Sequence, residues 1–346
     1  MTTLSVLLLA AGQGTRMQSK RQKILHEVGG KPMLLHLFEA AESIVDMRPV
    51  VVIGPGGDGV KALLGDRAQY VVQAEQLGTG HAVRMAASVL NGRSDQVIVT
   101  YGDMPLLRAE TMTRLALQQS ETKATIAMMT VMGDPQSSFG RVLRDEDGHV
   151  IEIVEVSEAK QRANGQEILA VREMNAGVYC FDAYWLWQNI SHLPLRKARN
   201  GHEYYLTDLV AMAVEQGRLV DAVVTDDPDE CLGAGTRAEL VAVEKAFRRR
   251  ANRRWLSRGV TLVDPDSTFI DQDVVIGQDT VIWPNTFLQG DTAVGDDCII
   301  GPNTILRNTR VGHRCRIEQA VVENVTVPDD TAVPPFTHLN DDRAAE

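Results

Sequence analysis

Several features are scarce in this 346-residue sequence, and each scarcity excludes a class of protein. The four cysteines, Cys180, Cys231, Cys298 and Cys315, include no C-x-x-C pair. This argues against a zinc site and a disulfide framework, and it agrees with a reducing compartment. Acidic residues outnumber basic ones, with 46 Asp and Glu against 35 Lys and Arg. This balance argues against a general nucleic-acid or membrane-surface binder.

Long apolar runs are missing as well. No stretch approaches the ~20 apolar residues that a membrane-spanning helix needs. The apolar N-terminus has no basic residue ahead of it, so we do not interpret it as an export signal. We therefore expect a soluble, cytoplasmic protein whose partners include neither nucleic acid nor a membrane.

The first two thirds of the chain alternate short apolar runs with longer amphipathic segments. Residues 50–53, 96–99 and 125–129 are typical of buried strands, and residues 33–46, 80–90 and 110–120 of helices. This alternation predicts an α/β domain with a mostly parallel sheet. Ligands of such sheets bind beyond the carboxyl ends of the strands.

A glycine loop follows the first predicted strand. The apolar run of residues 6–9 ends at Gly12-Gln13-Gly14, and residues 16–31 then contain five basic residues and one acidic residue. Glycine allows main-chain N–H groups to approach an oxyanion. In a chain whose net charge is −11, this local cluster of cations predicts an anionic ligand.

The pattern changes after Gly259. Aliphatic residues recur every six positions, and small side chains follow most of them by four: Ile270, Ile276, Ile282, Leu288, Val294, Ile300 and Leu306, with Thr280, Thr286, Thr292, Cys298 and Thr304. This predicts a hexapeptide-repeat β-helix of about four coils. The register breaks at residues 308–310 and resumes with Val311. A basic helix over 239–258 precedes it, and its apolar stripe favours a linking helix over a nucleic-acid site.

The whole pattern of motifs resembles a known family. The run L-x-x-G-x-G-T-R-M-x-x-x-x-x-K-x-L, the segment from Gln73 to Ala82, and Tyr101-Gly102-Asp103 resemble the sugar-1-phosphate nucleotidylyltransferases. The resemblance is closest to the bifunctional N-acetylglucosamine-1-phosphate uridylyltransferases/glucosamine-1-phosphate acetyltransferases. It implies a Rossmann-like nucleotidyltransferase domain (1–238), a linking helix (239–260), a short left-handed parallel β-helix (261–338) and a disordered tail (339–346).

The family reaction is attack of a sugar 1-phosphate on the α-phosphorus of UTP, which gives UDP-N-acetylglucosamine and pyrophosphate. Such chemistry depends on positioning, cations and a metal. The resemblance implies catalytic Arg16 and Lys23, Asp103 as the Mg²⁺ ligand, nucleotide contacts from Leu9, Ala11, Gly12, Gly14, Gln73, Gly78 and Thr79, and substrate contacts from Tyr101, Gly102, Gly140, Glu155, Asn175, Tyr205 and Thr207. The amide of Gln73 offers a donor and an acceptor to the imide edge of uracil.

The resemblance also implies a homotrimer formed through the β-helix. The acetyltransferase residues of the family lie on later coils, and residues 333–339 have no arginine where that set begins, so we expect acetyl transfer to be absent. An acyltransferase is accordingly the weakest of the hypotheses. His313 and His338 are more typical of structural or surface histidines than of a catalytic base.

Three positions depart from the family pattern. Gln22 replaces a proline before Lys23, Val156-Ser157 follow Glu155 in place of His-Lys, and Gly235 replaces the asparagine expected as a second metal ligand. Water, Thr236 or Asp229 would then have to compensate. Two alternatives to the main hypothesis stay open: a nucleotidylyltransferase for another sugar or for dTTP, and a catalytically weak sensor or scaffold that binds nucleotide sugars.

Overall fold

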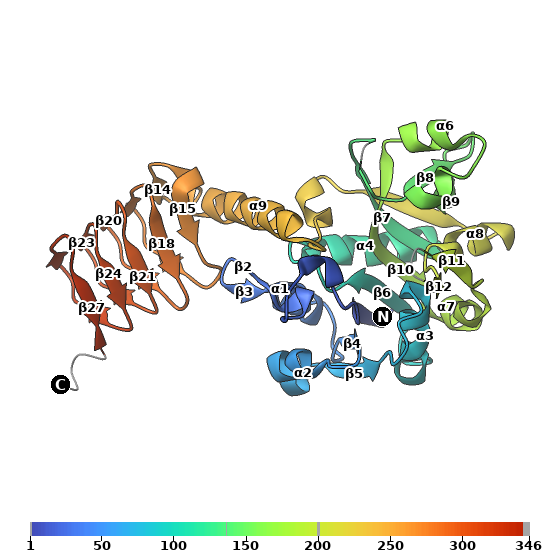
Figure 1. The fold of residues 1–346 in the computed structure, drawn as a ribbon, viewed down its shortest axis with the longest axis horizontal. Helices are drawn as coiled ribbons and strands as arrows, with labels where there is room; N and C mark the ends of the chain where they lie inside the picture. The colour runs from blue at the N-terminus through green and yellow to red at the C-terminus, as the bar shows by residue number, and fades with distance from the viewer. Residues whose placement is uncertain (1, 136, 199–200, 342–346) are drawn as a thin grey trace. The chain divides into compact units, whose positions relative to one another are not determined.

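The computed structural model describes residues 2–135, 137–198 and 201–341. It divides into two compact units (Figure 1). The N-terminal unit comprises Met1–His26 and Met33–Glu239, and the C-terminal unit comprises Glu27–Pro32 and Leu240–Glu346. The α/β domain and the β-helix that the sequence predicts are both present.

The N-terminal unit is built on a mixed sheet. Its main strands run in the order β13 (Val220–Val224), β7 (Ile126–Met132), β10 (Glu173–Asp182), β6 (Gln96–Tyr101), β1 (Leu4–Ala10), β4 (Val50–Ile53) and β5 (Gln69–Val72). Neighbours pair in parallel except at β10, which is antiparallel to both β6 and β7. A small antiparallel pair, β8 (Arg141–Arg144) and β9 (Val150–Val154), extends from β10. The mostly parallel sheet is confirmed, and the long antiparallel strand is a feature that the apolar runs did not predict.

Helices cover both faces of this sheet. Leu7 of β1 packs into one core with α3 (Thr79–Leu90), α7 (Ala183–Asn189) and α8 (Asp208–Glu215). Val6 and Leu8 point into the opposite core with α1 (Met33–Glu42), α2 (Asp58–Leu64) and α4 (Ala109–Thr122). Burial on both faces explains why residues 6–10 of β1 are all apolar. Two short helices, α5 (Val156–Ala159) and α6 (Gly165–Ala170), pack beside β9.

The C-terminal unit contains most of α9 (Arg237–Leu256) and three parallel sheets. The first sheet contains β14 (Thr261–Leu262), β17 (Val281–Ile282), β20 (Ile299–Ile300), β23 (Arg316–Ile317) and β26 (Ala332–Val333). The second contains β15 (Thr268–Ile270), β18 (Thr286–Gln289), β21 (Ile305–Arg307), β24 (Val321–Glu323) and β27 (His338–Asn340). The third contains β16 (Val275–Ile276), β19 (Ala293–Val294), β22 (Arg310–Val311) and β25 (Thr326–Val327).

The six-residue period has a direct structural cause. Each strand pairs with the strand one coil further along, and the repeated aliphatic residues are buried along the axis. The predicted small residues are buried too, and the Thr280 hydroxyl donates to the Gly295 carbonyl at 2.7 Å. The predicted break is a shorter coil: pairing steps by 18 residues from Val275 to Ala293 but by 17 from Ala293 to Arg310.

A hairpin from the N-terminal part of the sequence, β2 (Glu27–Val28) and β3 (Lys31–Pro32), belongs to the C-terminal unit. The Gly29 N–H donates to the Glu244 carboxylate at 2.9 Å, and Gly29 O accepts from Gln272 N at 2.9 Å. Gly29 has φ +54°, and a Cβ there would lie 2.0 Å from the Phe247 ring. The turn therefore requires glycine for both its backbone angle and its close packing.

Two further expectations concern the chain outside these elements. Residue 340 ends β27, whereas residues 342–346 of the predicted tail lie outside the described residues. Among the helices of the described residues, none combines the length and the apolar character required to cross a membrane.

Leu306→Ala should destabilise the C-terminal unit by about 2–5 kcal/mol, because this fully buried side chain fills the axis of the β-helix. Urea unfolding combined with hydrogen exchange of residues 261–340 measures the effect. Thr326→Ala, at an exposed position of β25, is the control and should change stability by less than about 0.5 kcal/mol. Equal losses for the two variants would contradict the assigned core.

Candidate functional site

Two adjoining cavities lie at the carboxyl ends of β1 and β6. Parallel pairing of Leu9 with Tyr101 brings these two strand ends level. The smaller cavity, about 310 Å³, is lined by Leu9, Ala10, Ala11, Gly12, Lys23, Ile24, Gln73, Gln76, Gly78, Thr79, Ala82, Tyr101, Asp103 and Glu203. The larger, about 540 Å³, includes Arg16, Lys23, Tyr101, Asp103, Ser137, Phe139, Gly140, Glu155, Asn175, Gly235 and Glu239.

Lys23, Tyr101 and Asp103 line both cavities and so mark their common border. Lys23 Nζ lies 2.5 Å from Asp103 Oδ2, with 21% and 16% of the two side chains exposed. This pair is thus neither buried nor fully solvated, and a ligand entering either cavity can reach it. The stem of Lys23 packs on the glycine loop, since a Cβ at Gly14 would lie 2.6 Å from Lys23 Cβ.

The wall of the smaller cavity is held by backbone and amide hydrogen bonds. Gln73 is buried and donates through Nε2 to Gly78 O at 3.0 Å, and Gln76 Nε2 donates to Ala11 O. Tyr204 joins this loop on both sides: its N–H donates to Leu77 O and its carbonyl accepts from Gly80 N, each at 2.8 Å. Hydrogen bonds therefore fix three of the predicted nucleotide residues, Ala11, Gln73 and Gly78, in the wall of this cavity.

Gly78 allows this close packing. Its φ is +92°, and a Cβ would lie 2.7 Å from Tyr204 O. Thr79 makes a second link, since its hydroxyl oxygen accepts from Leu206 N at 3.1 Å and its side chain is hydrogen-bonded to Tyr101. Burial is the main reason that the pKa of Tyr101 is raised, so its phenol stays protonated.

The larger cavity brings together three residues that are distant in the sequence. Asn175 N donates to Gly140 O at 2.9 Å, and Glu155 Oε1 would lie 3.4 Å from a Cβ at Gly140. Asn175 Oδ1 accepts from Gly177 N at 3.0 Å and from the Tyr179 hydroxyl at 2.8 Å. Its amide NH₂ therefore keeps its hydrogens for a ligand. Gly140, Glu155 and Asn175 were predicted together, and the structure places them together.

The carboxylate in this group is perturbed. Burial raises the pKa of Glu155, and the nearby Glu158 and Asp208 carboxylates raise it further. A ligand N–H or O–H that donates to Glu155 would offset this desolvation. The Tyr101 ring also borders this cavity, packed where a side chain at Gly177 would otherwise be, 2.3 Å from the Gly177 Cβ position.

Sequence reasoning missed the residue that shapes one wall of the larger cavity. Arg141 is completely buried, and its guanidinium donates to three carbonyls of the adjoining loop, at Pro135, Ser137 and Phe139. Burial lowers the pKa of Arg141. Its charge is thus solvated by carbonyl dipoles and holds Phe139 and Gly140 against the cavity. The position directly after Gly140 was the one sequence signal available.

Gly235 occupies the position where the family pattern predicts an asparagine as second metal ligand. A Cβ at Gly235 would lie 2.5 Å from a guanidinium nitrogen of Arg16, so Arg16 fills the space that a side chain there would need. Gly235 N donates at 2.7 Å to Glu239, whose carboxylate lines the same cavity. Glu239 was not predicted, since it lies on a helix far along the chain.

Neither Thr236 nor Asp229 lines the two cavities within the described ranges. The larger cavity offers three carboxylates as hard oxygen donors, those of Asp103, Glu155 and Glu239. Mg²⁺ prefers one or two carboxylates together with phosphate and water ligands. The side chains of the larger cavity therefore fit this ion.

Four predicted residues are outside the two linings: Gly14, Gly102, Tyr205 and Thr207. Gly14 supports Lys23, and Gly102 N donates to Leu9 O at 2.9 Å, which joins the ends of β1 and β6. Thr207 is buried at the start of α8. Burial raises the pKa of Tyr205. The predicted substrate contacts of Tyr205 and Thr207 are thus not supported by the lining.

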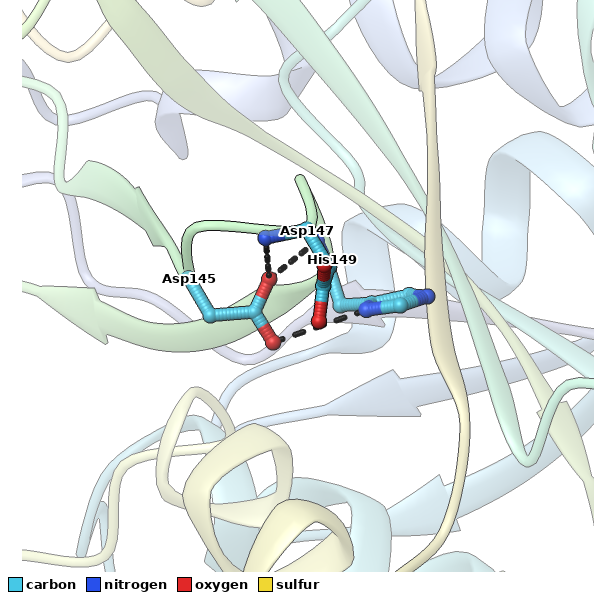
Figure 2. Close-up of side chains that lie close together, drawn as sticks. All are labelled: Asp145, Asp147 and His149. Carbon is cyan, nitrogen blue, oxygen red and sulfur yellow. Dashed lines mark hydrogen bonds and ion pairs between the residues drawn. The ribbon is translucent and has the colours of Figure 1, made fainter.

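An acidic cluster elsewhere in this unit has a local explanation. Asp145, Asp147 and His149 are exposed and lie together in the turn between β8 and β9 (Figure 2). Asp145 Oδ1 accepts from Asp147 N at 3.1 Å and from His149 N at 2.8 Å. These bonds, with the His149 backbone N–H first, lower the pKa of Asp145. The cluster stabilises a turn and lies outside both cavities.

Comparison with family models gives two matches. Residues 6–185 match the MobA-like NTP transferase domain, and residues 273–308 match the bacterial transferase hexapeptide (six repeats). The fold also resembles a solved Bacillus anthracis protein assigned as a glucose-1-phosphate thymidylyltransferase, in complex with a sucrose. The TM-score is 0.56 at 19% identity, over 71% of this chain and 96% of that one. At that identity the likeness shows the fold alone.

Curated relatives match along nearly the whole chain. The bifunctional protein GlmU of Exiguobacterium sibiricum is 40% identical over 336 residues, which is 96% of this chain and 73% of that protein. The GlmU of Pelobacter propionicus is 42% identical over 98% of this chain and 73% of its own length. The GlmU of Bacillus subtilis is 40% identical over 97% and 72%, respectively.

Gly14→Ala should displace Lys23 from Asp103, because the new methyl group would overlap the Lys23 stem. Gly56→Ala is a matched control: Gly56 also has positive φ, at +82°, but nothing lies within 4 Å of its Cβ position. Both variants should lose about 1 kcal/mol from backbone strain. Crystal structures should show the Lys23–Asp103 contact broken in Gly14→Ala alone. An intact contact in both variants would contradict the packing assigned to Gly14.

Proposed function

Because this chain belongs to the nucleotidyltransferase family that includes the GlmU proteins, we propose that it forms UDP-N-acetylglucosamine and pyrophosphate from UTP and N-acetylglucosamine 1-phosphate. The single observation that carries the proposal is the border between the two cavities. A lysine and an aspartate are paired there, between a wall that carries Gln73 and a wall that carries Glu155 and Asn175. Two substrates bound on either side would meet at that pair.

The smaller cavity suits a nucleotide. Gln73 presents an amide at its wall, and Ala11 and Gly12 begin the glycine loop beside Lys23. Backbone N–H groups of such a loop can accommodate phosphate oxygens. We assign the uracil to the Gln73 wall and the triphosphate to the glycine loop, which brings the α-phosphate to the border.

The larger cavity suits the sugar phosphate. The Asn175 amide can donate to a sugar oxygen, and the Glu155 carboxylate can accept from a hydroxyl or from the acetamido N–H. The sugar phosphate then enters the border from the side opposite the nucleotide. Its oxygen attacks the α-phosphorus, and the bond from that phosphorus to the bridging oxygen of the pyrophosphate group breaks. Pyrophosphate leaves with the electron pair of that bond.

Two cations of the chain serve this step. Lys23, at the border, is assigned to the α-phosphate, where its point charge stabilises the oxygens of the reacting centre. Arg16 lines the larger cavity close to the shared border, and we assign it to the departing phosphates because its guanidinium can bind two oxygens at once. Asp103 would hold Mg²⁺, and we assign Glu239 rather than Glu155 as a further carboxylate for the ion, because Glu155 is assigned to the sugar. When bound, the ion supplies further neutralisation of phosphate charge.

Lys23→Met and Asp103→Asn should each lower kcat for pyrophosphate release by about 10²–10³, because each removes charge stabilisation at the reacting phosphate. The measurement is pyrophosphate release with Mg²⁺ and UTP or dTTP, over a panel of sugar 1-phosphates. Lys61→Met is the control: Lys61 is half exposed on α2, and its one ion pair within the described part of the chain is a 4.0 Å contact with Asp58, so the activity of this variant should be unchanged.

Full activity in both site variants would overturn the mechanism. Release with a different sugar 1-phosphate, or with dTTP in preference to UTP, would keep the chemistry and correct the substrate. Binding of UDP-N-acetylglucosamine without pyrophosphate release from any pair would favour a sensor or scaffold.

We also propose that the C-terminal unit does not transfer acetyl groups. The support is local: residues 333–339 contain no arginine. The two histidines of the β-helix are half exposed and engaged by carboxylates on the preceding coil. His313 Nδ1 lies 3.2 Å from Asp296 Oδ2 and accepts from Asp296 N, and His338 Nε2 lies 3.1 Å from Glu323 Oε2. These contacts join neighbouring coils of the β-helix and are typical of structural histidines.

For the β-helix itself we propose self-association into a homotrimer. One of its faces carries an apolar row: Phe269, Phe287, Ile305 and Val321 point outward from successive strands of the second sheet. A polar row of Gln289, Arg307 and Glu323 lies beside it, and the Arg248 guanidinium is 4.4 Å from the Phe269 ring centroid. Phe269 and Phe287 stack with ring centroids 4.6 Å apart. A continuous apolar ladder of this kind suits burial against a second copy of the same chain.

Phe287→Glu should convert the trimer to monomers, because a carboxylate in the centre of this ladder would be desolvated without a partner. Light scattering after size exclusion measures the mass. Thr326→Glu places the same charge at an exposed position of the third sheet and should leave the trimer intact. A monomeric wild-type protein, or a trimeric Phe287→Glu variant, would exclude this face as the interface.

A further inference from the structure

The Gln73 amide is held by two acceptors. Its Nε2 donates to Gly78 O at 3.0 Å and lies 3.1 Å from His81 Nδ1. Gln73 directly follows β5, and His81 is in the first turn of α3, so these contacts close the loop between strand and helix. Gln73 and His81 are both buried, with 3% and 7% exposed. An amide in this position cannot rotate without breaking buried hydrogen bonds.

An uncharged imidazole can accept a hydrogen bond, and the surroundings of His81 favour the uncharged form. Burial lowers the pKa of His81, and the nearby Arg84 lowers it further, against a smaller opposing effect of the Glu75 carbonyl and carboxylate. The N-terminal end of α3 also disfavours a cation there. Tyr204 is a third neighbour of His81, and the centroids of the two rings are 6.4 Å apart. The Arg84 guanidinium lies over the Tyr204 ring, with Cζ 4.9 Å from the ring centroid. Gly78 O can only accept, so the amide NH₂ faces both groups, and we assign His81 the tautomer with its proton on Nε2 and a lone pair on Nδ1.

This geometry leaves one group of Gln73 for a ligand. A primary amide has two N–H hydrogens, and Gly78 O and His81 Nδ1 take both. In the described parts of the chain, no donor bonds to Gln73 Oε1, and Gln73 lines the smaller cavity. Gln73 therefore offers a ligand in this cavity its acceptor Oε1, whereas its NH₂ donor is already used by the protein.

Resting on the proposed function, we infer that His81 is a positioning residue for base specificity. By holding the amide hydrogens of Gln73 away from the base, it presents Oε1 to the ring N–H of a pyrimidine-2,4-dione such as uracil. Cytosine has a lone pair at the same ring nitrogen, so two acceptors would face each other without a hydrogen. Without the imidazole, the amide can turn and offer its NH₂, which pairs with cytosine.

Calorimetric binding of UTP and CTP, with Mg²⁺ and no sugar phosphate, tests this inference without turnover. Wild type should prefer UTP by about ten- to a hundredfold, the discrimination typical of an unsatisfied buried polar group. His81→Leu removes the acceptor and should reduce the preference about tenfold. His81→Asn, whose side-chain oxygen can replace Nδ1, should retain it. His81→Gln, whose amide group extends beyond the position of Nδ1, should lose the preference for UTP.

The ratio of the two affinities separates this role from a structural one, because general damage to the loop weakens both nucleotides alike. Should His81→Leu fail to fold, the contrast between His81→Asn and His81→Gln still decides. Equal preference in wild type and in folded His81→Leu and His81→Gln would overturn the inference and leave the proposed function intact. Failure of wild type to bind either nucleotide would overturn the proposed function, and this inference with it.

Discussion

Parallel pairing of β1 with β6 is the constraint on which the candidate site depends. It brings the glycine loop after Ala10 level with Tyr101 at the end of β6 and with the turn that contains Asp103, although the two segments are far apart in the sequence. The Gly102 N–H donates to Leu9 O and closes this edge. Lys23 then reaches Asp103 at the border of the two cavities. Helices on both faces bury these strands, so the edge is a rigid base for the side chains of the site.

Buried polar side chains shape the cavity walls around that edge. Gln73 is held by Gly78 and His81, Asn175 by Gly177 and Tyr179, and Arg141 by three loop carbonyls. Some donors and acceptors of these side chains are bonded to the protein, and only the others are available to a ligand. Such groups are costly to leave unsatisfied, so their orientation is strongly determined.

Glycines contribute space as much as backbone freedom. The Tyr101 ring occupies the side-chain position of Gly177, the stem of Lys23 packs on Gly14, and the Arg16 guanidinium lies against Gly235. Gly235, which interrupts the family motif, thus makes room for a cation next to the Glu239 carboxylate. Gly235 lacks a side chain, and those of Arg16 and Glu239 lie next to it instead. This arrangement depends on tertiary packing.

The cavity residues Gln73, Asp103 and Glu155 were predicted from the resemblance of their motifs to a known family. Local patterns in the sequence determined the buried strands, the glycine loop and the hexad period with its break. These follow from periodicity and spacing, which depend on near neighbours in the chain. Tertiary structure alone decided the antiparallel place of β10, the membership of the 27–32 hairpin, and the parts played by Arg141, Glu239 and His81. Those features depend on contacts between distant segments, and single-sequence spacing carries no information about which distant groups share a hydrogen bond.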